Sequence, residues 1–124
     1  MTESVAGTSR DDLLALRDAL RRFAADRDWE PFHTPKNLAT ALAVEAAELL
    51  EPFQWLSDAQ SRSLTAQQAA AVREEMADVL LYLIRLADQL DVDLIAAAAE
   101  KLLRNAEKYP VAKAKGTSRK YQEL

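Results

Sequence analysis

Apolar residues recur along most of this chain with the period of a helix rather than that of a strand. Near the N-terminus, Leu13, Leu16, Leu20 and Phe23 are spaced by three or four residues, so they line one stripe of a helix. A strand would instead alternate apolar and polar residues at every second position. This first segment therefore predicts an amphipathic helix over about 9–26.

Capping residues and prolines predict three further helices. Thr34 followed by Pro35 is typical of a helix start, and Pro52 should end or kink that helix. Thr65 with Gln68 forms a capping box before the next helix, and an aspartate caps the last. The expected helices after the first span about 35–52, 65–91 and 93–110, with a connection at 26–35 and a polar loop at 57–64.

These elements predict an all-α fold, a bundle of four to five helices. Only two glycines occur in 124 residues, and alanine and leucine are abundant, which favours helix over sheet. We expect a flexible N-terminus at 1–9, a helical domain at 10–110 and a basic tail at 111–124. The second helix is apolar nearly all round, as is much of the third. We therefore expect self-association to cover them, because large apolar patches are rarely left exposed.

Composition excludes several classes of protein. The net charge of −4 and the pI near 5.0 argue against nucleic-acid binding, which needs a basic face. The chain has no cysteine, so disulfides and thiolate metal sites are excluded. No apolar run approaches 18 residues without charge, and no signal peptide is recognised. We expect a cytoplasmic protein that binds neither membrane nor nucleic acid.

Two pairs of acidic residues interrupt the apolar runs. Glu45 and Glu48 lie in the second helix, and Glu75 and Asp78 lie in the third. Residues three apart are about 60° apart around a helix, so each pair projects from one face. Carboxylates in such apolar surroundings cost several kcal/mol each unless they are compensated. Together the pairs would form a cluster that a hard divalent cation neutralises, whereas separately they are ordinary surface acids or salt-bridge partners.

Other metal chemistries lack their ligands in this chain. Zinc enzymes need several histidines or cysteines, and His33 is the only histidine. The Glu-x-x-His pairs of di-iron bundles are absent, as is a Gly-x-x-x-x-Gly-Lys phosphate loop. Ligation by oxygen alone remains, which suits Mg²⁺ or its substitute Mn²⁺. Because such ions usually bind together with substrate phosphates, the cluster is suggestive of phosphoryl chemistry.

The acidic motif and several flanking strings resemble the MazG-like all-α nucleoside triphosphate pyrophosphatases, and most closely their dCTP-hydrolysing group. The likeness runs over roughly residues 10–124. The flanking strings are Arg-Asp-Trp-Glu (27–30), Phe-His-x-Pro-Lys-Asn-Leu (32–38), Phe-Gln-Trp (53–55), Asp-Val-Leu-x-Tyr-Leu (78–83) and Ser-Arg-Lys-Tyr-x-Glu-Leu (118–124).

The resemblance implies Mg²⁺-dependent hydrolysis of a deoxynucleoside triphosphate to the monophosphate and pyrophosphate. The favoured substrate is dCTP or a 5-modified dCTP, and the role is cleansing of the nucleotide pool. Glu45, Glu48, Glu75 and Asp78 match the metal ligands. One ligating glutamate also accepts the proton of the attacking water; Glu48 is our first candidate and Glu45 the second. The group forms tetramers, so we favour a homotetramer over a homodimer.

The resemblance also implies which residues bind substrate. Trp29 and Trp55 match the residues that stack on the base, and Tyr82 matches a hydroxyl near the sugar or phosphates. The matches in the last helix and the tail are candidates for phosphate binding: Lys101, Asn105, Lys108, Tyr109, Arg119 and Lys120. Each of these aromatic and basic residues has a simpler alternative, namely packing for the aromatics and a solvated surface for the basic residues.

One departure from the group concerns the choice of base. Where animal members carry a histidine near the base, this chain has Leu20, which cannot donate a hydrogen bond. Discrimination among pyrimidines should therefore be weaker, because His33 and backbone groups are the remaining groups that could hydrogen-bond to the base. The alternatives are the same chemistry on dUTP, an oxidised nucleotide or phosphoribosyl-ATP, or a helical assembly module that has lost catalysis.

Overall fold

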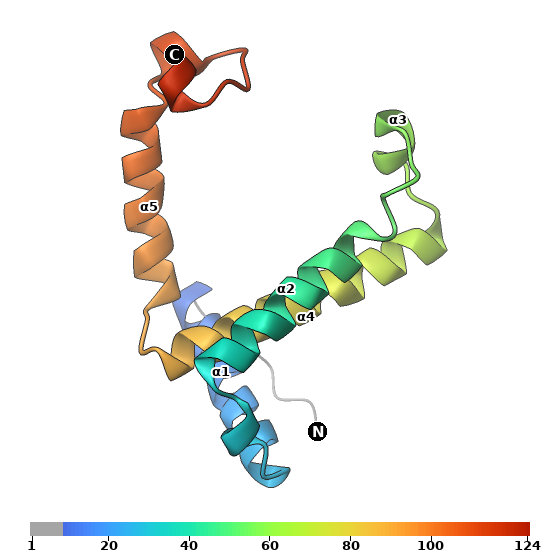
Figure 1. Ribbon diagram of the computed structural model, residues 1–124, viewed down its shortest axis with the longest axis vertical. Coiled ribbons are helices and arrows are strands. Elements are labelled where there is room, and N and C mark those ends of the chain that lie inside the picture. Colours follow the sequence, from blue (N-terminus) through green and yellow to red (C-terminus); the bar gives the residue numbers. More distant parts are fainter. Residues whose placement is uncertain (1–8) are drawn as a thin grey trace. The chain divides into compact units, whose positions relative to one another are not determined.

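The computed structural model describes residues 9–124, and every regular element in that range is a helix (Figure 1). The all-α prediction is thus confirmed. Of the expected flexible segment 1–9, all but Ser9 lies outside the described residues. The elements are α1 (Ser9–Asp26), η1 (Glu30–Phe32), α2 (Pro35–Leu50), α3 (Asp58–Ser61), α4 (Ala66–Gln89), α5 (Leu94–Lys108), α6 (Val111–Ala114) and η2 (Tyr121–Glu123).

The capping signals read from the sequence are present at the helix starts. The Thr34 hydroxyl accepts a hydrogen bond of 3.2 Å from the backbone N–H of Asn37, at the start of α2. Thr65 and Gln68 form a full capping box at α4, with hydrogen bonds of 2.9 and 3.2 Å. Asp93 caps α5 through the N–H three residues further on. These contacts involve residues within one turn, which is why sequence alone predicts them.

Short helices occupy segments that the sequence predicts as connections or tail. The expected polar loop 57–64 contains α3, which begins with a second capping box made by Ser57 and Gln60. The connection before α2 contains η1, and the expected tail contains α6 and η2. The Ser-x-x-Gln spacing at α3 carries the same signal as the one at α4, so this helix was predictable. The others are too short to show a period.

The chain divides into two compact units, one ending at Asp91 and the other comprising Val92–Leu124. In the first unit, α2 and α4 lie side by side and α1 packs against α4 (Figure 1). Few apolar side chains of residues 11–124 are buried; they are Ala24, Leu38, Ile84 and Ala87. Large apolar side chains stay exposed on α2 and α4, namely Val44, Leu50, Met76 and Leu80.

The second unit contains α5, α6 and η2. Tyr109 at the end of α5 meets Tyr121 of η2 edge to face, with ring centroids 6.1 Å apart. The ammonium of Lys108 lies 5.0 Å from the centre of the Tyr121 ring. These contacts order the C-terminal segment against the end of α5. No helix in the described range combines the length and the apolar character needed to cross a bilayer.

Candidate active site

Three of the four motif acids converge where α2 and α4 pack together. Glu45 and Glu48 of α2 and Glu75 of α4 each present a carboxylate oxygen, and these oxygens lie within 4.8 Å of one another. The fourth acid, Asp78, lies one turn after Glu75 on α4, and its negative charge acts on Glu45. The i, i+3 spacing placed each pair on one face, and the packing of α2 against α4 brought the two faces together.

The acidic residues of the cluster carry negative charge that the cluster itself does not neutralise. One oxygen of Glu45 and one of Glu75 are buried without a hydrogen-bond donor among the described residues. The pKa of Glu45 is raised to about 7, first by a shared hydrogen bond with Glu75, then by desolvation, and then by Glu48 and the charge of Asp78. Two carboxyl groups share a hydrogen bond only while one holds a proton, so ionisation leaves both inward oxygens unpaired.

A hard divalent cation fits this donor set. Carboxylate oxygens are the ligands that Mg²⁺ and Mn²⁺ prefer, and Glu45, Glu48 and Glu75 can be spanned by one ion. The two unpartnered oxygens are atoms that such an ion would satisfy. The chemistry of the residues present therefore agrees with the metal predicted from the sequence.

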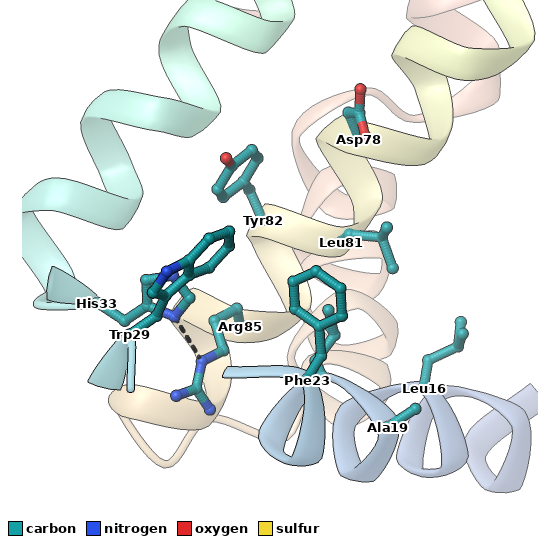
Figure 2. A pocket seen from close by; sticks show the side chains of 10 residues that line it. Leu16, Ala19, Phe23, Trp29, His33, Asp78, Leu81, Tyr82 and Arg85 are labelled. Carbon is teal, nitrogen blue, oxygen red and sulfur yellow. Dashed lines mark hydrogen bonds between the residues drawn. The ribbon is translucent and has the colours of Figure 1, made fainter. Parts of the chain in front are cut away.

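An apolar pocket of about 410 Å³ opens beside Asp78 (Figure 2). Its walls come from α1, α4 and the connection that precedes α2. The lining residues are Leu16, Ala19, Leu20, Phe23, Trp29, His33, Asp78, Leu81, Tyr82 and Arg85. Leu20 thus lies in the wall of the cavity that also contains Trp29.

The α4 residues of the pocket lie along one face of that helix. Asp78, Tyr82 and Arg85 follow at i, i+4 and i+7, which spans about 10 Å along the axis. Asp78 marks the end near the acidic cluster, and Arg85 marks the opposite end, beside His33 (Figure 2). The pocket is thus polar at two separated ends, with apolar and aromatic walls between them.

The end of α1 fixes the position of Trp29. Asp28 takes a left-handed conformation with φ of 54°, which usually requires glycine but which aspartate tolerates. The backbone N–H of Trp29 then donates to the carbonyl of Ala24 over 2.9 Å and closes the last turn. The indole packs edge to face against Phe23 at 5.6 Å and His33 at 6.1 Å. Trp29 remains 43% exposed, so one side of its ring is available to a ligand.

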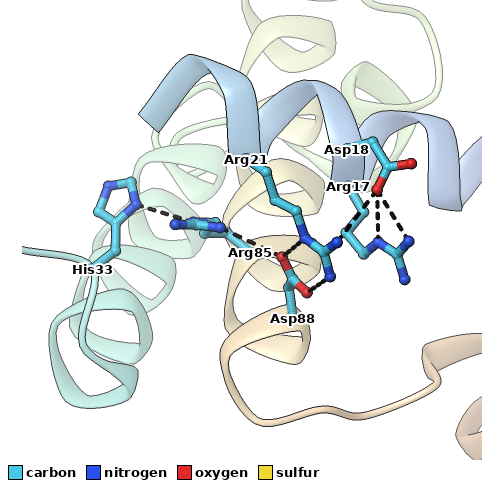
Figure 3. Close-up of polar contacts among 6 residues, drawn as sticks. All are labelled: Arg17, Asp18, Arg21, His33, Arg85 and Asp88. Carbon is cyan, nitrogen blue, oxygen red and sulfur yellow. Dashed lines mark hydrogen bonds and ion pairs between the residues drawn. The ribbon is translucent and has the colours of Figure 1, made fainter. Parts of the chain in front are cut away.

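A chain of ionic and hydrogen-bond contacts links His33 to α1 (Figure 3). Arg85 donates from Nε to Nδ1 of His33 over 3.1 Å and from Nη1 to Asp88 over 3.4 Å. Asp88 in turn accepts from Nε of Arg21 over 2.7 Å, and this bond and the Arg21 charge lower the pKa of Asp88. Burial, and then the charge of Arg85, lower the pKa of His33.

Sequence reasoning assigned no role to Arg85 or Asp88. The available signal was a cation and an anion spaced i, i+3 on an apolar helix. That signal does not reveal that α1 and the loop before α2 supply the other partners, Arg21 and His33. It also does not reveal that Arg85 is only 5% exposed.

Trp55 lies away from the pocket. It follows α2, whereas Trp29 precedes it, and a helix of 16 residues is about 24 Å long. Its side chain is 87% exposed and is not among the pocket residues. Within one chain the two indoles therefore do not face each other.

The remaining candidates belong to the second compact unit. Five are exposed and Asn105 is partly buried; the exposed ones are Lys101, Lys108, Tyr109, Arg119 and Lys120. Arg119 also lines a cavity of about 380 Å³ with Lys113, Thr117, Glu123 and Leu124. Their role in phosphate binding stays a prediction.

Fold and site together define an all-α protein with a carboxylate cluster, suited to a hard cation, beside an apolar pocket. The MazG-like family model matches residues 40–124, which is more than half of the chain. The chain therefore belongs to the MazG-like family.

Curated relatives and a solved structure agree with this assignment. The chain is 46% identical over 104 residues to dCTP pyrophosphatase 1 of Rattus norvegicus, and equally to that of Homo sapiens. These matches cover 82% of this chain but 61% of each relative, so the chain spans less than two-thirds of their length. A crystal structure of a pyrophosphatase from Archaeoglobus fulgidus superposes with a TM-score of 0.75 at 39% identity. That match covers 89% of this chain and 99% of the other.

Proposed function

We propose that this protein hydrolyses a pyrimidine deoxynucleoside triphosphate, with dCTP or a 5-modified dCTP favoured, to the monophosphate and pyrophosphate. The observation that carries this proposal is the convergence of Glu45, Glu48 and Glu75 within 4.8 Å, next to an aromatic pocket. Relatives named dCTP pyrophosphatase and pyrophosphatase support it. A cytoplasmic role in cleansing the nucleotide pool is part of the same proposal.

The four acids would hold Mg²⁺, with Mn²⁺ as a substitute. The bound ion would neutralise charge on the phosphate oxygens and help to orient the attacking water. Glu48, or else Glu45, would accept the proton from that water. Asp78 would complete the ligand set from the side that faces the pocket, where it already acts on Glu45 through its charge.

The pocket would hold the nucleoside. Trp29 offers a partly exposed ring for stacking on the base, and Tyr82 lies between the base end and Asp78, within reach of the sugar or phosphates. Any pyrimidine can stack on Trp29, and the Leu20 side chain contributes only an apolar part of the pocket wall. This favours a second candidate within the same chemistry, namely hydrolysis of dUTP or dTTP alongside dCTP.

Self-association would complete this arrangement, and we propose a homotetramer or a homodimer. Among residues 11–124, few side chains are buried within one chain, and Val44, Leu50, Met76 and Leu80 are exposed on the helices that carry the acids. An 87% exposed Trp55 at the far end of α2 is also suited to contact a second copy. Phosphate binding by residues of the second unit belongs to the same proposal. These residues are Lys101, Asn105, Lys108, Tyr109, Arg119 and Lys120.

The decisive experiment measures pyrophosphate release from dCTP, 5-methyl-dCTP, dUTP, dTTP and dATP, with Mg²⁺ and with EDTA. We expect release from the pyrimidine triphosphates that EDTA abolishes. Equal turnover of dATP would reduce the proposal to a general nucleoside triphosphate pyrophosphatase. If none of these five nucleotides were hydrolysed, the remaining alternatives would be an oxidised nucleotide or phosphoribosyl-ATP as the substrate, or a helical assembly module without catalysis.

A further inference from the structure

His33, the only histidine of the chain, lies in the pocket wall next to Trp29 (Figure 2). Its Nδ1 accepts a hydrogen bond of 3.1 Å from Nε of Arg85. An arginine Nε carries a proton and cannot accept one, so Nδ1 of His33 must be unprotonated. The neutral ring therefore holds its proton on Nε2, and the contact selects this tautomer.

Arg85 is itself held firmly. It is 5% exposed, and a guanidinium so far from water needs a charged partner, which Asp88 supplies. Asp88 is fixed in turn by two hydrogen bonds from Arg21 on α1 (Figure 3). The Arg21–Asp88 pair joins α1 to α4. The bond from Arg85 to His33 adds nothing to that tie, whereas it does determine the orientation and the protonation of the imidazole.

The imidazole is one of few polar groups in the pocket. Of the others, Asp78 lies at the end near the acidic cluster and Tyr82 lies one turn further along α4. Arg85 directs Nε and Nη1 to His33 and Asp88 rather than to the cavity. At the end distant from the acids, the side-chain donors of the pocket wall that remain for a ligand include Nε2–H of His33, which Arg85 holds in place, and the indole N–H of Trp29.

We propose that Arg85 is a positioning residue that holds His33 as its Nε2–H tautomer, and that this N–H donates to an acceptor on the edge of the nucleobase. For cytosine the acceptors are the O2 carbonyl and N3. This inference rests on the proposed function, because it takes the pocket as the base site. A donor fixed in apolar surroundings disfavours a ligand that leaves it unpaired, so His33 is a specificity-determining residue.

The first test reads the imidazole directly and needs no turnover. With ¹⁵N-labelled histidine, a long-range ¹H–¹⁵N spectrum shows the nitrogens of a single ring. We expect the proton on Nε2 in the native protein, a mixture of tautomers in Arg85→Met, and no change in Arg73→Met, an exposed arginine of the same helix. A proton on Nδ1 in the native protein, or an unchanged tautomer in Arg85→Met, would overturn the positioning role.

Binding of dCMP, a product of the proposed reaction, extends the same measurement. We expect the Nε2–H resonance of His33 to shift on addition of dCMP, and to shift much less on addition of ribose 5-phosphate, which lacks a base. No shift with dCMP would overturn base recognition by His33. Because neither probe is hydrolysed, a protein without pyrophosphatase activity would still give a clear result, which separates this inference from the proposed function.

Kinetics then test how much His33 and Arg85 contribute to the use of dCTP. Glutamine places an amide N–H near the position of Nε2, whereas the shorter asparagine reaches only the position of Nδ1. We expect His33→Gln to retain most of kcat/KM for dCTP, and His33→Asn and Arg85→Met each to lose about tenfold, mainly through KM. In the His33→Gln background, Arg85→Met should cost less than about twofold. The same tenfold loss in that background would refute the proposed route through His33.

A variant that keeps the buried charge covers the case in which Arg85→Met does not fold. Arg85→Lys retains a cation beside Asp88, but a single ammonium does not reproduce the fork that reaches Asp88 and His33 together. We expect it to fold, as judged by circular dichroism, and to show the same tautomer mixture and the same rise in KM. A lysine variant with the native tautomer and native KM would count against the proposal.

Discussion

Glu45 of α2 and Glu75 of α4 each turn one carboxylate oxygen inward, and no group in the described part of the chain donates to either. Their oxygens also lie within 4.8 Å of each other and of Glu48. A proton held between them relieves this arrangement, which is the main reason that the pKa of Glu45 is raised to about 7. A bound cation would replace that proton.

The metal-free protein should therefore lose stability as the pH rises from about 4.5 to about 7. In this window the folded state keeps the proton on Glu45, whereas the unfolded state, with the ordinary pKa of 4.5, releases it. The unfolded state then binds fewer protons, so the free energy of unfolding falls with pH. Thermal melts in EDTA at pH 5, 6, 7 and 8 measure this.

Two comparisons complete that experiment. Mg²⁺ should raise the melting temperature more at pH 8 than at pH 5, because the cation competes with the proton. Glu45→Gln should flatten the decline, whereas Glu74→Gln, which changes an exposed neighbour of Glu75, should preserve it. A stability profile that rises across this window in the native protein would contradict the shared proton.

Glu48→Gln should lower kcat by on the order of 10²-fold or more while the fold is retained. The substitution removes one charge at nearly constant shape from the site where three carboxylates meet. Pyrophosphate release at saturating Mg²⁺ measures kcat, and calorimetric titration with Mg²⁺ or Mn²⁺ measures the expected loss of affinity. Glu74→Gln is the matched control, and native turnover in Glu48→Gln would refute the assignment.

The protein should be a tetramer or a dimer at micromolar concentration. Few side chains of residues 11–124 are buried within one chain, and Met76 and Leu80 are exposed on α4, the helix that carries Glu75. Light scattering should give a mass that is a multiple of 13.8 kDa. Leu80→Glu should shift the mass downward, whereas Gln67→Glu, at an exposed polar position of the same helix, should not. A native mass near 13.8 kDa would exclude self-association.

Trp29→Ala should raise KM for all pyrimidine triphosphates with little change in kcat. Stacking contributes about 1–3 kcal/mol per base and is shared by ground and transition states. Trp55→Ala should do the same only if a second copy brings that exposed indole to the pocket. Steady-state kinetics with dCTP, dTTP, dUTP and dATP measure both effects. If neither variant changed KM, the indoles would be packing residues.

Much of the secondary structure was predictable because it depends on neighbouring residues. Thr34, Thr65 and Asp93 cap helices through N–H groups within one turn, and the apolar stripe of α1 follows from its own period. The short helices α6 and η2 were not predicted, since a turn or two of helix carries no period and depends on contacts such as that between Tyr109 and Tyr121.

The sequence by itself determined that Glu45 and Glu48 share one helix face and that Glu75 and Asp78 share another. Helix geometry directs side chains three residues apart to the same face. Only the tertiary structure decided that the two faces meet, that Leu20 and Trp29 line one pocket, and that Arg85 is buried against His33. These relationships join segments that lie tens of residues apart in the sequence. They depend on how whole helices pack, which no local pattern of residues specifies.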